Sequence, residues 1–163
     1  MKKIILFIFS TILCMSAFAS ETLALTPQAI TKYIREHGAK ETVRNLYKDN
    51  DSRRWDFVIH KMESGDSDWL SIAKIIAEGT DAGTSEDLIV TLAIALPKNP
   101  RRVLQLIGTT SFLSYETVCN APFIEPTSVY LRNYLRKTRQ VLKNLKDTTV
   151  EEQRVKCLSQ IEK

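Results

Sequence analysis

The chain has 163 residues, of which 44% are hydrophobic and 26% are charged, and its formal net charge is +4. It is short for two full-size domains, and it is too apolar and too evenly charged for a disordered protein. Five glycines and five prolines exclude a collagen-like or low-complexity chain, and three cysteines are too few for a disulfide-dense miniprotein. The composition therefore predicts one globular domain.

The N-terminus has the three parts of a bacterial secretory signal peptide. Lys2 and Lys3 are basic, residues 4–15 form an apolar stretch, and Ala17-Phe18-Ala19 fits the small-x-small cleavage pattern. The apolar stretch is too short to span a bilayer comfortably. We predict a signal peptide over residues 1–19, a single helical domain over residues 20–163, and a periplasmic protein without a stable membrane anchor.

Cleavage after residue 19 leaves 144 residues, a net charge of +2 and two of the three cysteines, Cys119 and Cys157. Two cysteines in an oxidising compartment predict one disulfide, with two buried free thiols as the alternative. The third cysteine, Cys14, follows Leu13, whereas lipoprotein processing needs a small residue at that place. We therefore do not expect lipidation.

Apolar residues recur at three- and four-residue spacing along most of the chain, which predicts a succession of helices. Capping residues, glycines and prolines set their ends. The helices expected from these signals cover residues 27–37, 40–47, 53–63, 67–76, 85–96, 100–107 and 127–146, with a last helix near the C-terminus.

Three of the predicted helix starts depend on specific caps. Ser52 is expected to cap the third helix, and Thr84 with Asp87 resembles a capping box for the fifth. Thr149 with Glu152 is expected to form a capping box for the last helix. The stretch from Ser85 to Leu96 is apolar nearly all round, which is typical of a helix at the centre of a core.

No segment of alternating polar and apolar residues bounded by turn signals is present in the sequence. We therefore predict an all-α fold, a single compact bundle of seven or eight short helices. Helices of this length separated by short loops favour stacked, HEAT-like helical hairpins, although the sequence has no measurable repeat period. The disulfide would tie the irregular segment 108–127 to the terminal helix.

Charge is segregated along the sequence. Residues 49–87 hold ten acids and four bases, a net charge of −6, and residues 98–146 hold nine bases and two acids, a net charge of +7. The predicted long helix carries one ridge of bases at three- and four-residue spacing: Arg132, Arg136, Arg139, Lys143 and Lys146. This ridge is either an ordinary solvated face or a docking surface for an acidic partner or an anionic envelope surface.

A second candidate surface is acidic and rich in loops. Its members are Asp49, Asp51, Asp66, Asp68, Asp81, Glu86 and Asp87. The alternative is that several of them only cap helices. Nucleic acid is disfavoured as a partner because the mature charge is small and the expected compartment holds none.

Motifs for catalysis and metal binding are weak. Asp49-x-Asp51 begins like a calcium loop, but Arg53 stands where an oxygen ligand is needed. His37 and His60 lack the spacing of a zinc site. Glu36 and His37 could form an acid–base pair, but a histidine at a helix end is a simpler interpretation. We therefore expect a non-enzymatic protein without a metal or cofactor.

Three stretches resemble a pattern in small exported bacterial proteins: 65–70, 79–88 and 95–100. The expected architecture also resembles periplasmic immunity proteins of type VI secretion, of the Tai kind. That resemblance implies a helical, often disulfide-bonded and often dimeric protein that plugs the active site of a cell-wall-cleaving effector. The leading hypothesis is therefore a protein-binding inhibitor; an envelope accessory or scaffold protein and an enzyme acting on peptidoglycan are the alternatives.

Overall fold

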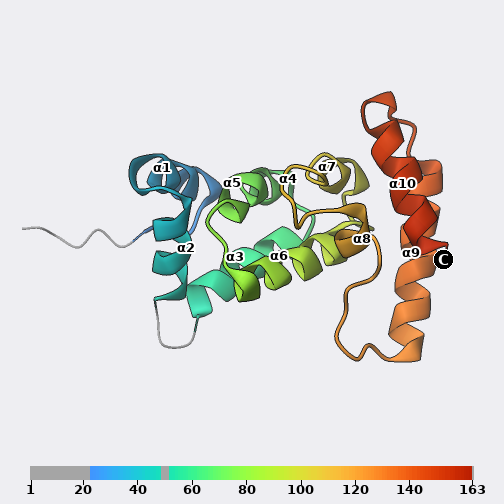
Figure 1. Cartoon of the computed structure of the whole chain (residues 1–163), viewed down its shortest axis with the longest axis horizontal. Helices are drawn as coiled ribbons and strands as arrows, with labels where there is room; N and C mark the ends of the chain where they lie inside the picture. The colour runs from blue at the N-terminus through green and yellow to red at the C-terminus, as the bar shows by residue number, and fades with distance from the viewer. Residues whose placement is uncertain (1–22, 49–51, 163) are drawn as a thin grey trace, which may run out of the picture.

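The computed structural model describes residues 23–48 and 52–162, and within them every regular element is a helix (Figure 1). The predicted signal peptide, Asp49 and Asp51 lie outside the described residues. The helices are α1 (Pro27–His37), α2 (Ala39–Tyr47), α3 (Arg53–Glu63), α4 (Ser67–Ser71), α5 (Ala73–Ala77), α6 (Ala82–Ala95), α7 (Pro100–Leu104), α8 (Tyr115–Val118), α9 (Ser128–Asn144), the 3-10 helix η1 (Thr148–Val150) and α10 (Glu151–Ile161). The all-α prediction is confirmed.

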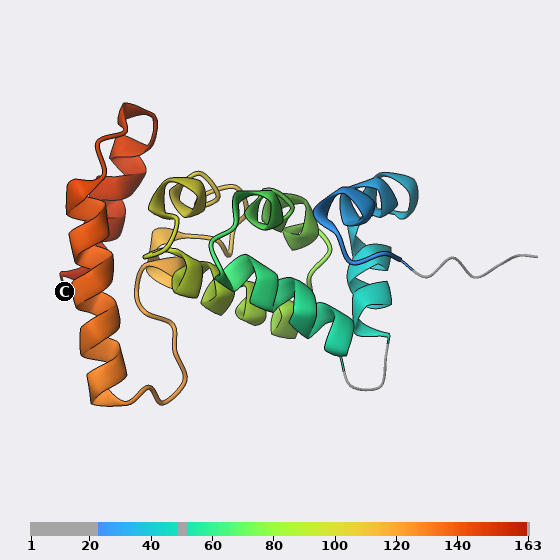
Figure 2. The ribbon, with the colours of Figure 1, turned by 180° about the vertical axis from the view of Figure 1, so that it is seen from behind.

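The helices form two layers and a terminal hairpin. Figures 1 and 2 show α1, α5, α4 and α7 in one row above a second row of α2, α3, α6 and α8. We call these eight helices the body. The antiparallel pair α9 and α10, the C-terminal hairpin, stands across one end of both rows. Stacked helical hairpins, as expected from the sequence, describe the body.

The register of the stacking follows from hydrogen bonds between residues 32 to 35 positions apart. The Trp55 indole N–H donates to Asp87 at 2.9 Å, and the Asn99 side-chain amide donates to the Gly65 carbonyl at 2.9 Å. Because the sequence offset between the bonded residues is nearly constant, α3 runs parallel to α6. The turn after α3 lies beside the turn after α6 for the same reason. The pair α3–α4 is thus followed by the pair α6–α7 in the same orientation.

Helix α6 lies at the centre of the core, as its apolar sequence predicts. Leu88, Leu92 and Ala95 have no exposed surface. The helix begins three residues earlier than expected, because Asp81 and Thr84 form the capping box. The prediction that Thr84 pairs with Asp87 was wrong: an aspartate is as good an N-cap as a threonine, and the Asp87 carboxylate is taken by Trp55.

Two other predicted caps also differ. Ser52 precedes α3 but has a left-handed backbone (φ 48°) and makes no side-chain cap bond; its hydroxyl instead donates to Asp56 at 3.3 Å. Near the C-terminus, the Asp147 carboxylate accepts from the Thr149 backbone N–H at 2.9 Å, which starts η1 rather than α10. The predicted Thr149–Glu152 box is therefore absent among the described contacts.

The predicted helix over residues 67–76 is divided into α4 and α5 at Ile72, whose N–H bonds to the Trp69 carbonyl three residues back. At the end of α5, Gly79 lies directly against the start of α2. A Cβ atom at this position would stand 2.3 Å from the Ala39 carbonyl carbon. Only glycine permits this approach, which places the end of α5 against the start of α2.

Besides apolar packing in the shared core, three bonds join the C-terminal hairpin to the body. The predicted disulfide is confirmed: Cys119, after α8, bonds to Cys157 in α10, with the Cα atoms 5.4 Å apart. The Tyr134 hydroxyl of α9 donates to the Ala93 carbonyl of α6 at 3.1 Å. Arg101 of α7 pairs with Asp147 at 2.7 Å. These contacts involve α9, α10 and the turn between them, so they fix the orientation of the whole hairpin.

Candidate partner-binding surfaces

The acidic residues predicted as one edge lie at different places in the body. Asp66 caps α4, accepting backbone N–H bonds of 2.9 and 3.1 Å, beside the C-terminal end of α6. Asp81 caps the opposite end of α6. Because α6 has 14 residues and is about 21 Å long, these carboxylates are not neighbours. The structure therefore divides the predicted acidic edge.

The remaining acids have individual environments. The Asp87 carboxylate is half-buried on the Trp55 indole, whereas Asp68 and Glu86 are exposed. The Thr84 backbone N–H and hydroxyl hold the pKa of Asp81 below its ordinary value. Asp66 and Asp81 thus cap helices, Asp87 instead accepts from Trp55, and Asp68 and Glu86 are exposed.

The basic ridge of α9 is divided as well. Its C-terminal half contacts the end of α10: Lys143 pairs with Glu162 at 3.1 Å, and Arg139 lies 3.9 Å from the same carboxylate. The Arg139 guanidinium also donates to the Ile161 carbonyl at 3.3 Å. Cations at a helix C-terminus are stabilised by its partial negative charge. These two bases therefore stabilise the hairpin.

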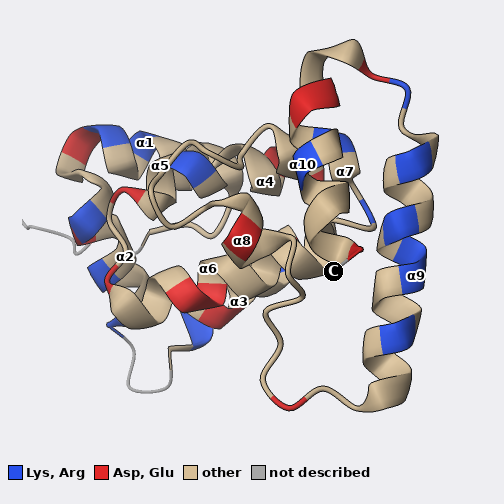
Figure 3. Cartoon of the chain, turned by 45° about the vertical axis from the view of Figure 1, so that its right-hand side comes forward, with Lys and Arg blue, Asp and Glu red and all other residues tan. Residues whose placement is uncertain are grey.

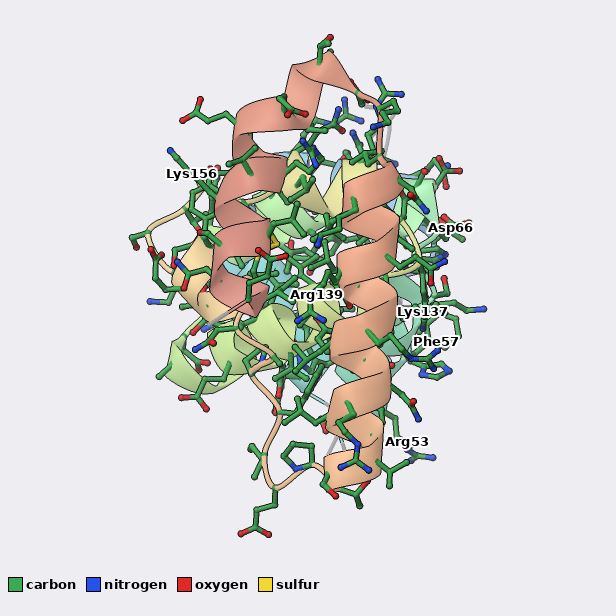
Figure 4. All side chains as sticks on the ribbon, turned by 90° about the vertical axis from the view of Figure 1, so that its right-hand side faces the viewer. Arg53, Phe57, Asp66, Lys137, Arg139 and Lys156 are labelled. Atoms are coloured by element: carbon green, nitrogen blue, oxygen red, sulfur yellow. A yellow bond between two sulfur atoms is a disulfide. The ribbon has the colours of Figure 1, made fainter. Side chains whose placement is uncertain are left out.

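The N-terminal half of the ridge faces solvent. Arg132 and Arg136 are exposed, and the described partner of Arg136 is the Asn133 side chain at 3.3 Å. Figure 3 shows the positions of Lys and Arg, in blue, along the length of α9. In Figure 4, Arg139 lies between α9 and α10, whereas Lys137 is on the opposite flank of α9. Of the predicted ridge, Arg132, Arg136 and also Lys146, beyond the end of α9, are exposed.

An apolar surface that the sequence reasoning missed lies at the start of α9. We call residues 123–130 the tip; in Figure 1 it is the loop and helix end that reach below the body. Ile124 is 91% exposed, Val129 57% and Tyr130 46%. The Phe123 ring packs edge-on against Tyr130 and Tyr134, with centroids 5.3 and 4.7 Å apart. The sequence signal for this surface is the apolar pair Phe123-Ile124, which lies between Pro122 and Pro126.

A groove of about 390 Å³ lies between the tip and the helices α3 and α6. Its lining comes from α3, α6 and the tip: Ile59, Glu63, Asp87, Val90, Thr91, Phe123 and Ile124. The groove therefore joins one of the predicted acids, Asp87, to the exposed apolar side chain of Ile124. Both the body and the tip contribute side chains to it.

A larger depression, of about 860 Å³, is at the other end of the body, between α2 and the turn before α6. Two cations, Lys40 and Arg44, line it, and Arg44 is paired with Glu41. His37 borders it, but its ring stacks on Tyr33 with centroids 4.2 Å apart, and Glu36 contacts Lys32. The contacts described for Glu36 and His37 are thus with Lys32 and Tyr33.

Within residues 23–48 and 52–162, no group of three or more His, Cys, Asp or Glu side chains could hold a metal ion. No helix of that part of the chain is long and apolar enough to cross a membrane. The disulfide is typical of proteins in oxidising compartments. Comparisons with family models, with curated proteins and with solved structures found no match for this chain.

Proposed function

We propose that this chain is an exported, non-enzymatic binding protein that acts in the periplasm as an inhibitor of the immunity type. It would occlude a secreted effector enzyme by filling the effector's cleft. The resemblance to type VI immunity proteins led to this hypothesis, and the observation that supports it most is the tip. A helix end and loop with large apolar side chains in solvent have the form of a plug.

The exposure of the tip is informative because apolar side chains gain free energy when they leave water. Tyr130 packs on Phe123, and Ile124 and Val129 are their neighbours along the chain, whereas scattered exposed apolar residues are ordinary on monomers. Aromatic residues such as Tyr130 are enriched at the energetic centres of protein interfaces. An interface is therefore the simplest reason for this cluster.

The support behind the tip is pre-organised. The disulfide, the Tyr134 hydroxyl and the Arg101–Asp147 pair fix α9 relative to the body. A rigid plug loses little conformational entropy on binding. Arg132 and Arg136, one and two turns along the same helix, would orient an acidic cleft and accelerate the encounter.

The test uses the mature chain, residues 20–163, as bait in periplasmic extract of its own bacterium, followed by assay of the captured enzyme. We expect a stoichiometric partner whose activity the purified chain inhibits. A double substitution at the tip, Ile124→Asp with Val129→Asp, should weaken inhibition at least tenfold. Val155→Asp is the matched control, because Val155 is 52% exposed on α10, away from the tip.

Two results would contradict the proposal. One is the absence of any stoichiometric partner of the wild-type chain. The other is a captured partner that the chain does not inhibit, which would favour an envelope accessory or scaffold role instead.

A further inference from the structure

We infer that the groove between the tip, α3 and α6 is the seat of a partner segment that carries a large apolar side chain next to a lysine or arginine. The inference rests on the proposed function only in taking the partner to be a protein. Beyond the proposed function, it specifies the chemistry of the bound partner segment and a second contact region, the groove. The tip enters the partner, and the groove receives the partner.

The apolar residues that line the groove come from the body and from the tip. Ile59 and Val90 of the body are partly exposed, and Phe123 and Ile124 of the tip face them across the groove. A volume of about 390 Å³ lies within the range of roughly 300–1,000 Å³ that is usual for binding pockets. One large apolar side chain with its neighbouring backbone suits this space.

The charged part of the groove is acidic. The Glu63 carboxylate contacts the His60 imidazole at 3.2 Å, and the Asp87 carboxylate contacts the neutral Trp55 indole. Lys98 lies nearby, but it donates to the Glu63 backbone carbonyl at 2.7 Å rather than to the carboxylate. Two carboxylates beside an apolar surface attract a cation, and the low local dielectric strengthens that attraction.

An unpartnered hydroxyl is a second, independent observation. Thr91 is 1% exposed and lines the groove, and its Oγ1 has no hydrogen-bond partner among the described residues. A buried hydroxyl without a partner costs free energy. The backbone of a bound segment could satisfy it after a small adjustment of the helix face.

Electrostatic repulsion disfavours two alternative occupants of the groove, an anionic lipid surface and a second copy of this chain. An anionic lipid surface would meet the carboxylates of Glu63 and Asp87, and also the exposed Glu125 of the tip. The tip of a second copy of this chain would bring its own Glu125, next to Ile124, against the same carboxylates. Like charges at close range disfavour both arrangements. A basic and apolar segment of a different protein is the occupant that the groove complements.

The experiment selects a displayed library of random 12-residue peptides against the folded mature chain. We expect the enriched peptides to pair a large apolar residue with Lys or Arg. Glu63→Lys should weaken them at least tenfold and shift a fresh selection toward Asp and Glu. Glu86→Lys, which reverses an exposed acid of α6 outside the groove, should change their affinity less than twofold.

Circular dichroism of each variant confirms that the fold is kept, and Ile124→Ala should weaken the same peptides by removing the apolar wall. Enriched peptides without bases, or peptides that Glu63→Lys does not weaken, would overturn the inference. So would a concentration-dependent dimer that Glu63→Lys disrupts in sedimentation, or binding to anionic vesicles through the groove. If the effector is inhibited through the tip but Glu63→Lys has no effect, the groove inference fails alone. If peptides bind as expected but no effector is inhibited, the proposed function fails alone.

Discussion

The body and the C-terminal hairpin share one apolar core, but they differ in the bonds that supplement the packing. In the body, α6 alone buries Leu88, Leu92 and Ala95 completely. In the hairpin, the buried residues of α9 are Tyr134, Thr138 and Leu142, and two of these three carry hydroxyls. The hairpin also contributes Leu142, Val150 and Ile161 to the same apolar core, so it joins the body through apolar packing as well as through individual bonds.

This difference explains how the tip can stay exposed. A helix positioned by packing has to bury a wide apolar stripe. A helix positioned by a disulfide, an ion pair and a buried hydroxyl can leave apolar residues at one end in solvent. These bonds supplement the packing of the hairpin while the apolar residues of the tip stay in solvent.

The largest expected effect is on the body. Leu92→Ala removes a fully buried side chain from the central helix and should lower the free energy of unfolding by about 2–5 kcal/mol. Urea unfolding followed by circular dichroism measures it. Ile124→Ala is the control: with 91% of its surface exposed, Ile124 should contribute almost nothing to stability. An equal loss in both variants would mean that the tip is part of the core.

Removal of the disulfide should affect the hairpin first. Replacing Cys119 and Cys157 by alanine should cost about 2–4 kcal/mol, because a closed loop of 38 residues restricts the unfolded chain. Hydrogen exchange should show loss of amide protection in α9 and α10 while α3 and α6 keep theirs. Uniform loss across both regions would contradict the division into a packed body and a tethered hairpin. Wild-type protein in reductant should match the double variant.

The buried hydroxyl of Tyr134 should have a smaller effect. Burial raises the pKa of Tyr134, so the phenol stays protonated and donates to the Ala93 carbonyl. Tyr134→Phe removes this bond and should lower stability by about 1 kcal/mol. Tyr130→Phe, at a ring that is 46% exposed, should be neutral in the same urea titration.

The smallest effects are on acid stability. Hydrogen bonds from the Thr149 hydroxyl and backbone N–H, with the nearby Arg101, hold the pKa of Asp147 below its ordinary value of 3.8. Such a carboxylate stabilises the fold at pH values above its unfolded pKa, and the contribution is lost as the pH falls through its lower folded pKa. Asp147→Asn should therefore flatten the fall of stability below about pH 4, measured as urea midpoints from pH 6 to pH 3.

The same titration compares the two regions. Asp81, whose pKa is also lowered, caps α6 in the body, whereas Asp147 starts η1 in the hairpin. Both Asp81→Asn and Asp147→Asn should flatten the curve of urea midpoints, but only Asp147→Asn should also change the amide protection of α10 selectively. Glu86→Gln, at an exposed carboxylate, should leave the curve unchanged. The opposite assignment of the two aspartates would contradict the separation of the regions.

Much of the fold was predictable because local rules decide it. The helices from α1 to α3 follow from periodicity, and Cys119 and Cys157 are the cysteines that remain after the predicted cleavage. Caps were less predictable, since Asp81 and Thr84 are both good N-caps and only the burial of Thr84 decides between them. Propensity cannot distinguish such neighbours.

The candidate surfaces were harder to predict, because they depend on which helices meet. Spacing placed Arg132, Arg136, Arg139 and Lys143 on one face of α9, but only the fold shows that Glu162 covers the last two. The groove needs Ile59, Val90 and Ile124, which come from three separate segments. No local pattern in the sequence joins them.

The disulfide also has a consequence for proteolysis. Cys119 and Cys157 close a covalent ring that contains the tip and the whole of α9. An exposed loop is where proteases cut most readily, and the tip is such a loop. A single cut there opens the ring without releasing either piece, because the disulfide still joins them. A nicked molecule would therefore keep both pieces together until a reductant separates them. The cut would disrupt the tip but leave the body intact.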